Sequence, residues 1–261
     1  MRIRAWSALL FAAAMIAGAC STSPAGLFRQ YEYEEDLYLS LDGSATIYVN
    51  SSVPAFNILR GTSIDPAPTA RIDDDVRKVF ETPLTHVTRL SRSSRRNNRR
   101  YLHVRLDARD VRRLNAVLPF SWSTYEFRQD GPSYVYRQTV GAPATAATPA
   151  DPPSPPGGFG AASGWTGDEI VAFRLHLPSR ITFHNTKTGV QRGNILVWEQ
   201  SLRDRLNGVP VALDVRMETQ SILSSTLKLF GVALVAAAVT FAFVIWWVSP
   251  TKAGLIQYWP P

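Results

Sequence analysis

Apolar and polar residues alternate along several stretches between residues 37 and 217, and this period of two predicts β-strands. Two neighbouring stretches carry an apolar residue at every second position: Leu37, Leu39 and Leu41, then Ala45, Ile47 and Val49. A three-residue loop over residues 42–44 would pair Leu41 with Ala45 and place all six apolar side chains on one face. We therefore predict a hairpin in that register, with Asp42-Gly43 in its turn.

The same alternation predicts further strands downstream. Residues 102–106 should pair back onto residues 84–90, and residues 125–128 should pair with 134–138 around a turn at 129–132. Additional strands are expected at residues 171–177, 195–198 and 209–217. Most of the chain between residues 37 and 217 is thus predicted to form antiparallel hairpins.

Helical spacing of apolar residues is less frequent. Residues 72–80 have it. Asp73 to Asp75 lie in the first turn, where the helix dipole stabilises acidic side chains, and we favour this role over metal binding. Val111, Leu114 and Leu118 predict the apolar stripe of a second helix that ends before Pro119, and residues 201–208 resemble a short capped helix. Two or three helices with a mainly antiparallel sheet make an α+β fold.

Residues 141–164 interrupt this pattern. The segment is rich in proline, alanine and glycine and contains too few large apolar residues to form a core. We expect an extended, disordered loop inside one domain that covers residues 20–228, since each half alone offers few apolar elements; a linker between two domains is the alternative.

The C-terminal region contains a long uncharged segment at residues 229–248. Its twenty residues would form a helix of about 30 Å, which matches the hydrocarbon core of a bilayer. Trp246 and Trp247 at one end suit the membrane interface, and Pro250 ends the segment. We predict one transmembrane helix followed by a short cytoplasmic tail at residues 249–261.

The N-terminus reads MRIRAWSALLFAAAMIAGACS, with two arginines, a short apolar run and small residues before Cys20. This is the pattern of a secretory signal peptide over residues 1–19. Cys20 is the one cysteine of the chain, and its position resembles the lipobox of bacterial lipoproteins, in which the sulfur carries a diacylglyceryl group. The resemblance implies acylation of Cys20; an ordinary exported protein with a chance cysteine is the alternative.

The positive charge is concentrated in one segment. Ten arginines and two acids fall between residues 89 and 113. The net charge of this segment is therefore +8, which exceeds the net charge of +7 for the whole chain. Because the segment is exported, we expect no nucleic-acid partner and consider anionic lipids, glycolipids or acidic proteins instead. The hypothesised binding residues at the tip of the predicted hairpin are Arg92, Arg95, Arg96, Arg99 and Arg100. A solvated tip without a ligand is the alternative.

No catalytic or cofactor-binding motif is present. The sequence contains no HExxH, CxxC, P-loop, G-x-S-x-G or G-x-G-x-x-G pattern. The four histidines, at positions 86, 103, 176 and 184, all lie in strand-like stretches and lack the spacing of a metal site. We therefore expect a protein that is not an enzyme, with no catalytic residue, no metal and no cofactor other than the acyl group on Cys20.

These features together resemble the LppM-type family of bacterial lipoproteins. The resemblance rests on the lipobox, the Asp42-Gly43 hairpin, the strand segment Gly193-Asn194-x-x-x-Trp198 and the C-terminal membrane helix. It implies an envelope domain that binds lipids or glycolipids without catalysis. The proline-rich segment and the arginine run depart from that family's pattern.

The predicted protein is a lipid-anchored, single-pass envelope protein in the bacterial cytoplasmic membrane, with its domain facing the periplasm or cell exterior. Its domain would bind lipid, glycolipid or another envelope component, with an apolar cavity between sheet and helices. A scaffold subunit of an envelope complex, with a flat apolar patch, is the alternative, and a hydrolase of envelope polymers is the third hypothesis.

Overall fold

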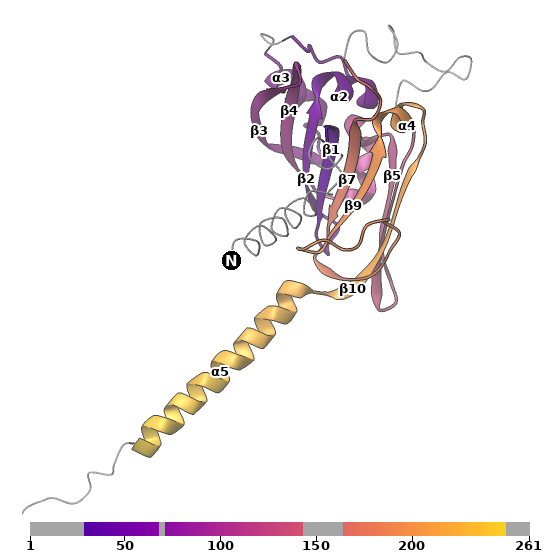
Figure 1. The fold of residues 1–261 in the computed structure, drawn as a ribbon. Coiled ribbons are helices and arrows are strands. Elements are labelled where there is room, and N and C mark those ends of the chain that lie inside the picture. The colour runs from indigo at the N-terminus through magenta and orange to yellow at the C-terminus, as the bar shows by residue number, and fades with distance from the viewer. Residues whose placement is uncertain (1–28, 68–70, 143–163, 249–261) are drawn as a thin grey trace, which may run out of the picture.

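Two β-sheets packed face to face form the body of the protein in this computed structural model, which describes residues 29–67, 71–142 and 164–248 (Figure 1). The first sheet has six strands in the order β3-β4-β2-β1-β7-β9, and the second has four in the order β5-β6-β10-β8. The strands of the first sheet are β1 (Tyr31–Leu39), β2 (Ala45–Ser52), β3 (Thr85–Arg96), β4 (Arg99–Ala108), β7 (Ile170–His176) and β9 (Ile195–Ser201). Those of the second are β5 (Ser123–Asp130), β6 (Ser133–Val140), β8 (Ser179–His184) and β10 (Val211–Ser221).

All pairings are antiparallel except that of β1 with β7, so the α+β prediction is confirmed. The helices are α2 (Val53–Arg60), α3 (Asp73–Phe80), α4 (Leu202–Leu206) and α5 (Ile222–Val248), with 3-10 turns η3 (Val111–Ala116) and η4 (Leu118–Phe120). The helices expected at residues 72–80 and 201–208 are confirmed as α3 and α4. The Ser201 side chain accepts a hydrogen bond from the Asp204 N–H at the start of α4.

The register predicted for the first hairpin is wrong by two residues. Leu39, not Leu41, lies opposite Ala45, and Leu37 lies opposite Ile47. The loop is longer than predicted because Ser40 and Ser44 close it, with the Ser40 N–H donating to the Ser44 carbonyl at 2.9 Å. A shift of two residues keeps the same side chains on the inner face, so the prediction of the apolar face still holds.

The segment after β4 also differs from prediction. It forms the 3-10 turns η3 and η4 instead of one α-helix. With three residues per turn, the inward stripe runs through Val111, Leu114 and Val117, which are at most 1% exposed, while Leu118 is 55% exposed. The Asp110 side chain begins η3 by accepting from the Arg112 N–H.

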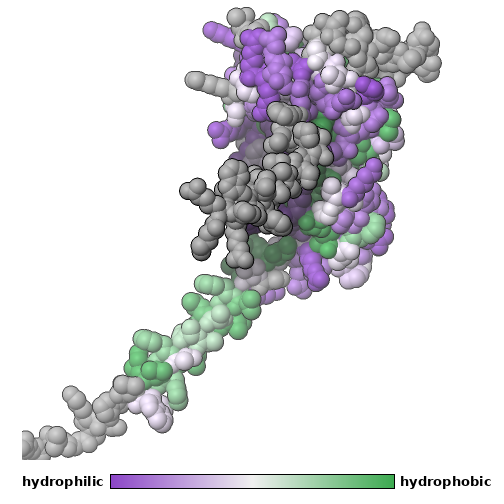
Figure 2. All heavy atoms as spheres, in the orientation of Figure 1, coloured by the Kyte–Doolittle hydropathy of each residue, from purple (hydrophilic) through white to green (hydrophobic). Residues whose placement is uncertain are grey.

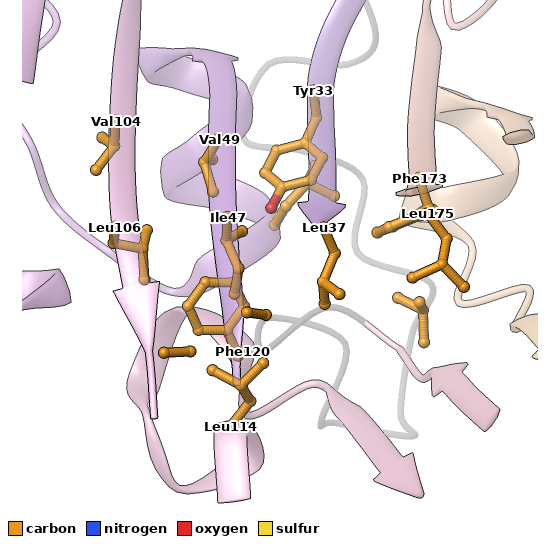
Figure 3. Close-up of a cluster of buried hydrophobic side chains, with 14 of the residues drawn as sticks. Tyr33, Leu37, Ile47, Val49, Val104, Leu106, Leu114, Phe120, Phe173 and Leu175 are labelled. Atoms are coloured by element: carbon orange, nitrogen blue, oxygen red, sulfur yellow. The ribbon is translucent and has the colours of Figure 1, made fainter. Parts of the chain in front are cut away.

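The core fills the space between the sheets (Figure 3). Tyr33 and Leu37 of β1, Ile47 of β2 and Phe173 of β7 point into it from the first sheet, and Phe120 of η4 enters between the layers. Side chains of the second sheet, such as Val215 of β10, close the core from the other side.

Both sheets combine strands from the two sides of residues 143–163. In the first sheet β7 pairs with β1, and in the second β10 pairs with β6. The residues before and after this segment therefore share one core. The expected disordered loop at residues 141–164 falls almost wholly on residues 143–163, which lie outside the described residues.

Candidate functional site

The arginine run lies at the tip of the β3–β4 hairpin, as predicted. Its turn is Asn97-Asn98, with Arg96 opposite Arg99. Both asparagines have positive φ, 48° and 60°, which is the backbone of the two-residue hairpin turn that suits the twist of paired strands. Asparagine tolerates this left-handed region better than most residues.

The five arginines expected at this tip have different environments. Arg95 and Arg96 are exposed, whereas Arg99 is only 7% exposed and its Nη2 lies 3.1 Å from Glu32 Oε1. Arg100 is half-buried and donates to the Ala67 carbonyl at 2.8 Å. The side chain of Arg92 lies outside the described residues. The expectation of a uniformly exposed tip is therefore wrong for Arg99, which belongs to an internal ion pair.

Glu32 holds Arg99 in place from the neighbouring part of the sheet. Its Oε1 also accepts from the hydroxyl of Tyr101 at 2.8 Å and from the Gln30 amide at 2.7 Å. Burial and the adjacent Glu32 carboxylate raise the pKa of the Tyr101 hydroxyl, so Tyr101 stays a neutral donor. This cluster fastens the base of the arginine tip to β1.

A second buried polar cluster lies between the two sheets. The guanidinium of Arg60, at the end of α2, donates to Glu35 Oε2 of β1 at 2.6 Å, and both side chains are 1% exposed. Tyr33 shares Glu35 Oε2 at 2.9 Å, and the Arg60 guanidinium lies 3.6 Å from the ring centroid of Trp122. The Gln138 amide reaches Glu35 Oε1 at 3.4 Å from the second sheet. The interior between the two sheets therefore contains a charged, hydrogen-bonded cluster that the sequence pattern did not predict.

Arg205 of α4 adds a second buried guanidinium on the same tryptophan, 5.3 Å from the Trp122 centroid. It donates to the carbonyl oxygens of Val140 and Gly141. Burial, and then the nearby charge of Arg60, lower the pKa of Arg205 to about 10. Arg205 therefore remains protonated at neutral pH, and the cluster ties α4 to the end of β6.

The four histidines do not meet. His86 lies opposite Asp107 and binds Glu81, whereas His103 lies opposite Ser91 on the same hairpin. His176 ends β7 in the first sheet and stacks on Tyr38 with centroids 3.7 Å apart, and His184 ends β8 in the second sheet. Among the described residues, no three His, Cys, Asp or Glu side chains converge as a metal site.

Helix α5 is apolar along most of its length, and its most apolar part is not buried by any other described residue. Its segment Thr226–Trp247 has 22 residues, a mean hydropathy of 2.5 and 0% of its most apolar window buried. Figure 2 shows it as a hydrophobic rod that projects from a largely hydrophilic domain. Length and composition suffice to cross a bilayer, in agreement with the helix predicted at residues 229–248.

The arginine tip and the start of α5 lie at opposite ends of the first sheet. The Ile222 N–H donates to the carbonyl of Pro178, just after β7, at 3.0 Å. The start of α5 is therefore beside the C-terminal end of β7. The strand pairing from β7 through β1 and β2 to β4 places the open end of the β3–β4 hairpin at this same end of the sheet. The tip is one strand length further on, roughly 33 Å away for ten residues.

The predicted signal peptide and Cys20 fall on residues 1–28, outside the described residues, as does the tail at 249–261. No protein-family model and no curated protein matches the chain. Among solved structures, the chain is similar to the NMR structure of the folded domain of the Mycobacterium tuberculosis LppM protein, with 10% identity and a TM-score of 0.36 over 73% of this chain and 92% of that one. This similarity is distant and does not assign the chain to a family.

Proposed function

We propose that this chain is a membrane-anchored protein of the bacterial envelope whose domain acts outside the cytoplasm by binding, not by catalysis. The observation that carries the proposal is α5, an apolar helix of membrane-spanning length whose most apolar window contains no residue buried by the described part of the domain. In water, the large apolar surface of this helix would carry an unfavourable free energy of hydration. Insertion into a bilayer removes that cost. The ligands proposed are lipid, glycolipid or another envelope component.

A second anchor is proposed at Cys20. The lipobox-like sequence before it supports acylation by diacylglycerol. β1 begins at Tyr31, at the end of the sheet opposite to α5. Tyr31 lies eleven positions after Cys20, and eleven steps of extended chain reach at most roughly 36–40 Å. Two anchors at opposite ends, one on so short a connection, would hold the domain close to the membrane surface.

The test of α5 uses a chain whose leader is replaced by a cleavable signal without cysteine, so that α5 is the one proposed anchor. Val235→Arg together with Val239→Arg should make the protein extractable by alkaline carbonate, since each charge costs about 2.5–3.5 kcal/mol at the helix centre. The matched control, Val235→Leu with Val239→Leu, should stay in the membrane pellet. Equal extraction of both proteins would contradict membrane insertion of α5.

Acylation is tested separately in the natural chain. Growth with an alkyne-bearing fatty acid should label the wild type, and Cys20→Ala should abolish the label and leave an unprocessed precursor. A Cys20→Ala protein that still takes up the label would refute the lipid anchor without affecting the proposal for α5.

A further inference from the structure

Three exposed arginines on one face of the β3–β4 hairpin have no acidic partner among the described residues. Arg89, Arg96 and Arg105 are all exposed, and within the described residues none of them forms an ion pair. In β4, Arg105 lies between Val104 and Leu106, which are both buried in the core. Because successive residues of a strand alternate between its faces, Arg105 and its neighbours across the hairpin point away from the second sheet. We call this surface the outer face.

The pairing across the hairpin places like charges opposite each other. Arg89 lies directly opposite Arg105, and Arg96 lies opposite Arg99. Like charges in directly opposed positions destabilise a sheet, and only Arg99 of these four is neutralised, by Glu32 at 3.1 Å. An anionic partner on the outer face would relieve this repulsion.

Elsewhere on the same face of the sheet, arginines lie beside acids, and the acids are in excess by one. On β7, Arg174 lies 2.7 Å from Glu34 and 3.3 Å from Asp36 of the adjacent β1. Arg29 is paired with Glu199 of β9. The unmatched positive charge is therefore confined to the β3–β4 side of the outer face.

The position of these arginines relative to α5 suits a flat surface. Arg105 and Arg99, the partner of Arg96, are six residues apart on β4, so the unmatched row is roughly 20 Å long. Figure 1 shows α5 leaving the domain obliquely, toward the side on which β3 and β4 lie.

We propose that the outer face of β3–β4, through Arg89, Arg96 and Arg105, rests on anionic lipid headgroups of the bilayer that contains α5. The inference rests on the proposed function, because α5 and the Cys20 anchor bring the domain to that surface. The proposed contact runs along the hairpin and is not limited to its tip. Arg99 and Arg100 stabilise the hairpin itself through their contacts with Glu32 and Ala67. Each arginine near an anionic surface strengthens the contact on the order of fivefold.

His103 lies in the middle of this row, and its pKa can report contact with an anionic surface. Its Nδ1 lies 2.9 Å from Asn50 Oδ1 of β2, and its Nε2 lies 2.9 Å from Ser94 Oγ of β3. Burial and then the charge of Arg96 lower the pKa of His103, while Glu34 of β1 raises it. A negative surface placed over Arg96 would favour the protonated imidazole and raise the pKa of His103.

The experiment uses the full chain in nanodiscs of either anionic phosphatidylglycerol or neutral phosphatidylcholine, with a gadolinium chelate on a fraction of the headgroups. In anionic discs, NMR signals of β3 and β4 should broaden strongly and the pKa of His103 should rise. Both effects should diminish at high salt. Replacing Arg89, Arg96 and Arg105 by Ser should weaken the contact on the order of a hundredfold and abolish both effects.

The matched control replaces three other exposed arginines by Ser and thus has the same net charge: Arg112, Arg128 and Arg180. It should behave as the wild type. Equal broadening in neutral and anionic discs, or in the wild type and the first variant, would overturn the inference. So would a hairpin that stays unbroadened in anionic discs but binds soluble inorganic polyphosphate, which would indicate a linear polyanion. None of these outcomes affects carbonate extraction, so the membrane anchor is judged independently.

Discussion

At the residue scale, the ion pair of Arg60 and Glu35 is the most exacting feature of the fold. Two charges have left water beside the rings of Tyr33 and Trp122, and their mutual attraction offsets this cost only while both are present. The pair joins α2 to β1 beneath Trp122, which leads into the second sheet. Its loss would therefore affect the packing of both sheets.

We predict that Arg60→Met lowers the free energy of unfolding by about 3–5 kcal/mol, because it leaves the Glu35 carboxylate buried without a cation. Arg60→Met combined with Glu35→Leu should recover most of that loss, since no buried charge remains. Urea unfolding followed by near-UV circular dichroism measures the four proteins of this cycle. A double variant that loses as much as the two single variants together would show that the charges act independently.

Asp42 is expected to make the first hairpin sensitive to acid. Hydrogen bonds from the Ser44 hydroxyl at 2.7 Å and the Ser44 N–H at 2.9 Å lower the pKa of the Asp42 carboxyl. A lowered folded-state pKa means stability that is present above the unfolded value of about 3.9 and is lost as pH falls through the folded value. Asp42→Asn and Ser44→Ala should each flatten the decline of Tm between about pH 5 and pH 2. An unchanged slope would contradict this.

The residues of the polar interior could not be found from the sequence. Arginine clustering identifies the tip of the hairpin, but nothing in the pattern distinguishes Arg60, which is 2% exposed, from a surface arginine. Glu35 sits at an inward position of β1 and interrupts the apolar alternation there, which is why the strand was expected to begin only near Leu37. Arg99 is hidden for a similar reason, because its partner Glu32 is distant in sequence.

At the element scale, elements with a clear apolar period or a capping pattern were predictable, whereas α2, β8 and the 3-10 turns were not. The β3–β4 and β5–β6 hairpins follow the expected pairing, since one apolar face and a short turn fix the register. Helix α2 was missed although Ser52 caps it and Pro54 lies in its first turn, because it follows β2 without a break. η3 follows a period of three, which resembles helical spacing over so short a segment.

The turn of the arginine hairpin gives a prediction at this scale. Asn98 has φ of 60°, a conformation that costs most residues about 1–2 kcal/mol. Asn98→Ala should therefore lower the free energy of unfolding by about 1 kcal/mol, whereas Asn98→Gly should change it little. Thermal unfolding of both variants measures the difference. Equal stability of the Ala and Gly variants would contradict a left-handed backbone conformation at Asn98.

At the scale of the whole molecule, the order of strands was beyond the reach of sequence patterns. The parallel pairing of β1 with β7 joins residues more than a hundred positions apart, and local alternation contains no information about such partners. That pairing nevertheless decides where the two proposed anchors lie on the domain. It places the start of β1 and the start of α5 at opposite ends of one sheet, so the two proposed anchors restrain the domain from both ends.

The last prediction concerns the direction in which α5 crosses the membrane. If residues 1–19 export the chain and α5 crosses once, residues 249–261 lie in the cytoplasm and residues 143–163 outside. A phosphatase reporter that folds only outside the cytoplasm should be inactive when fused after Pro261 and active when inserted beside Pro155. A fluorescent reporter that matures only in the cytoplasm, placed at the same two sites, should give the opposite pattern and controls for expression. Phosphatase activity at both sites would mean that α5 does not span the membrane. Activity after Pro261 alone would reverse the orientation and place the outer-face arginines on the cytoplasmic side.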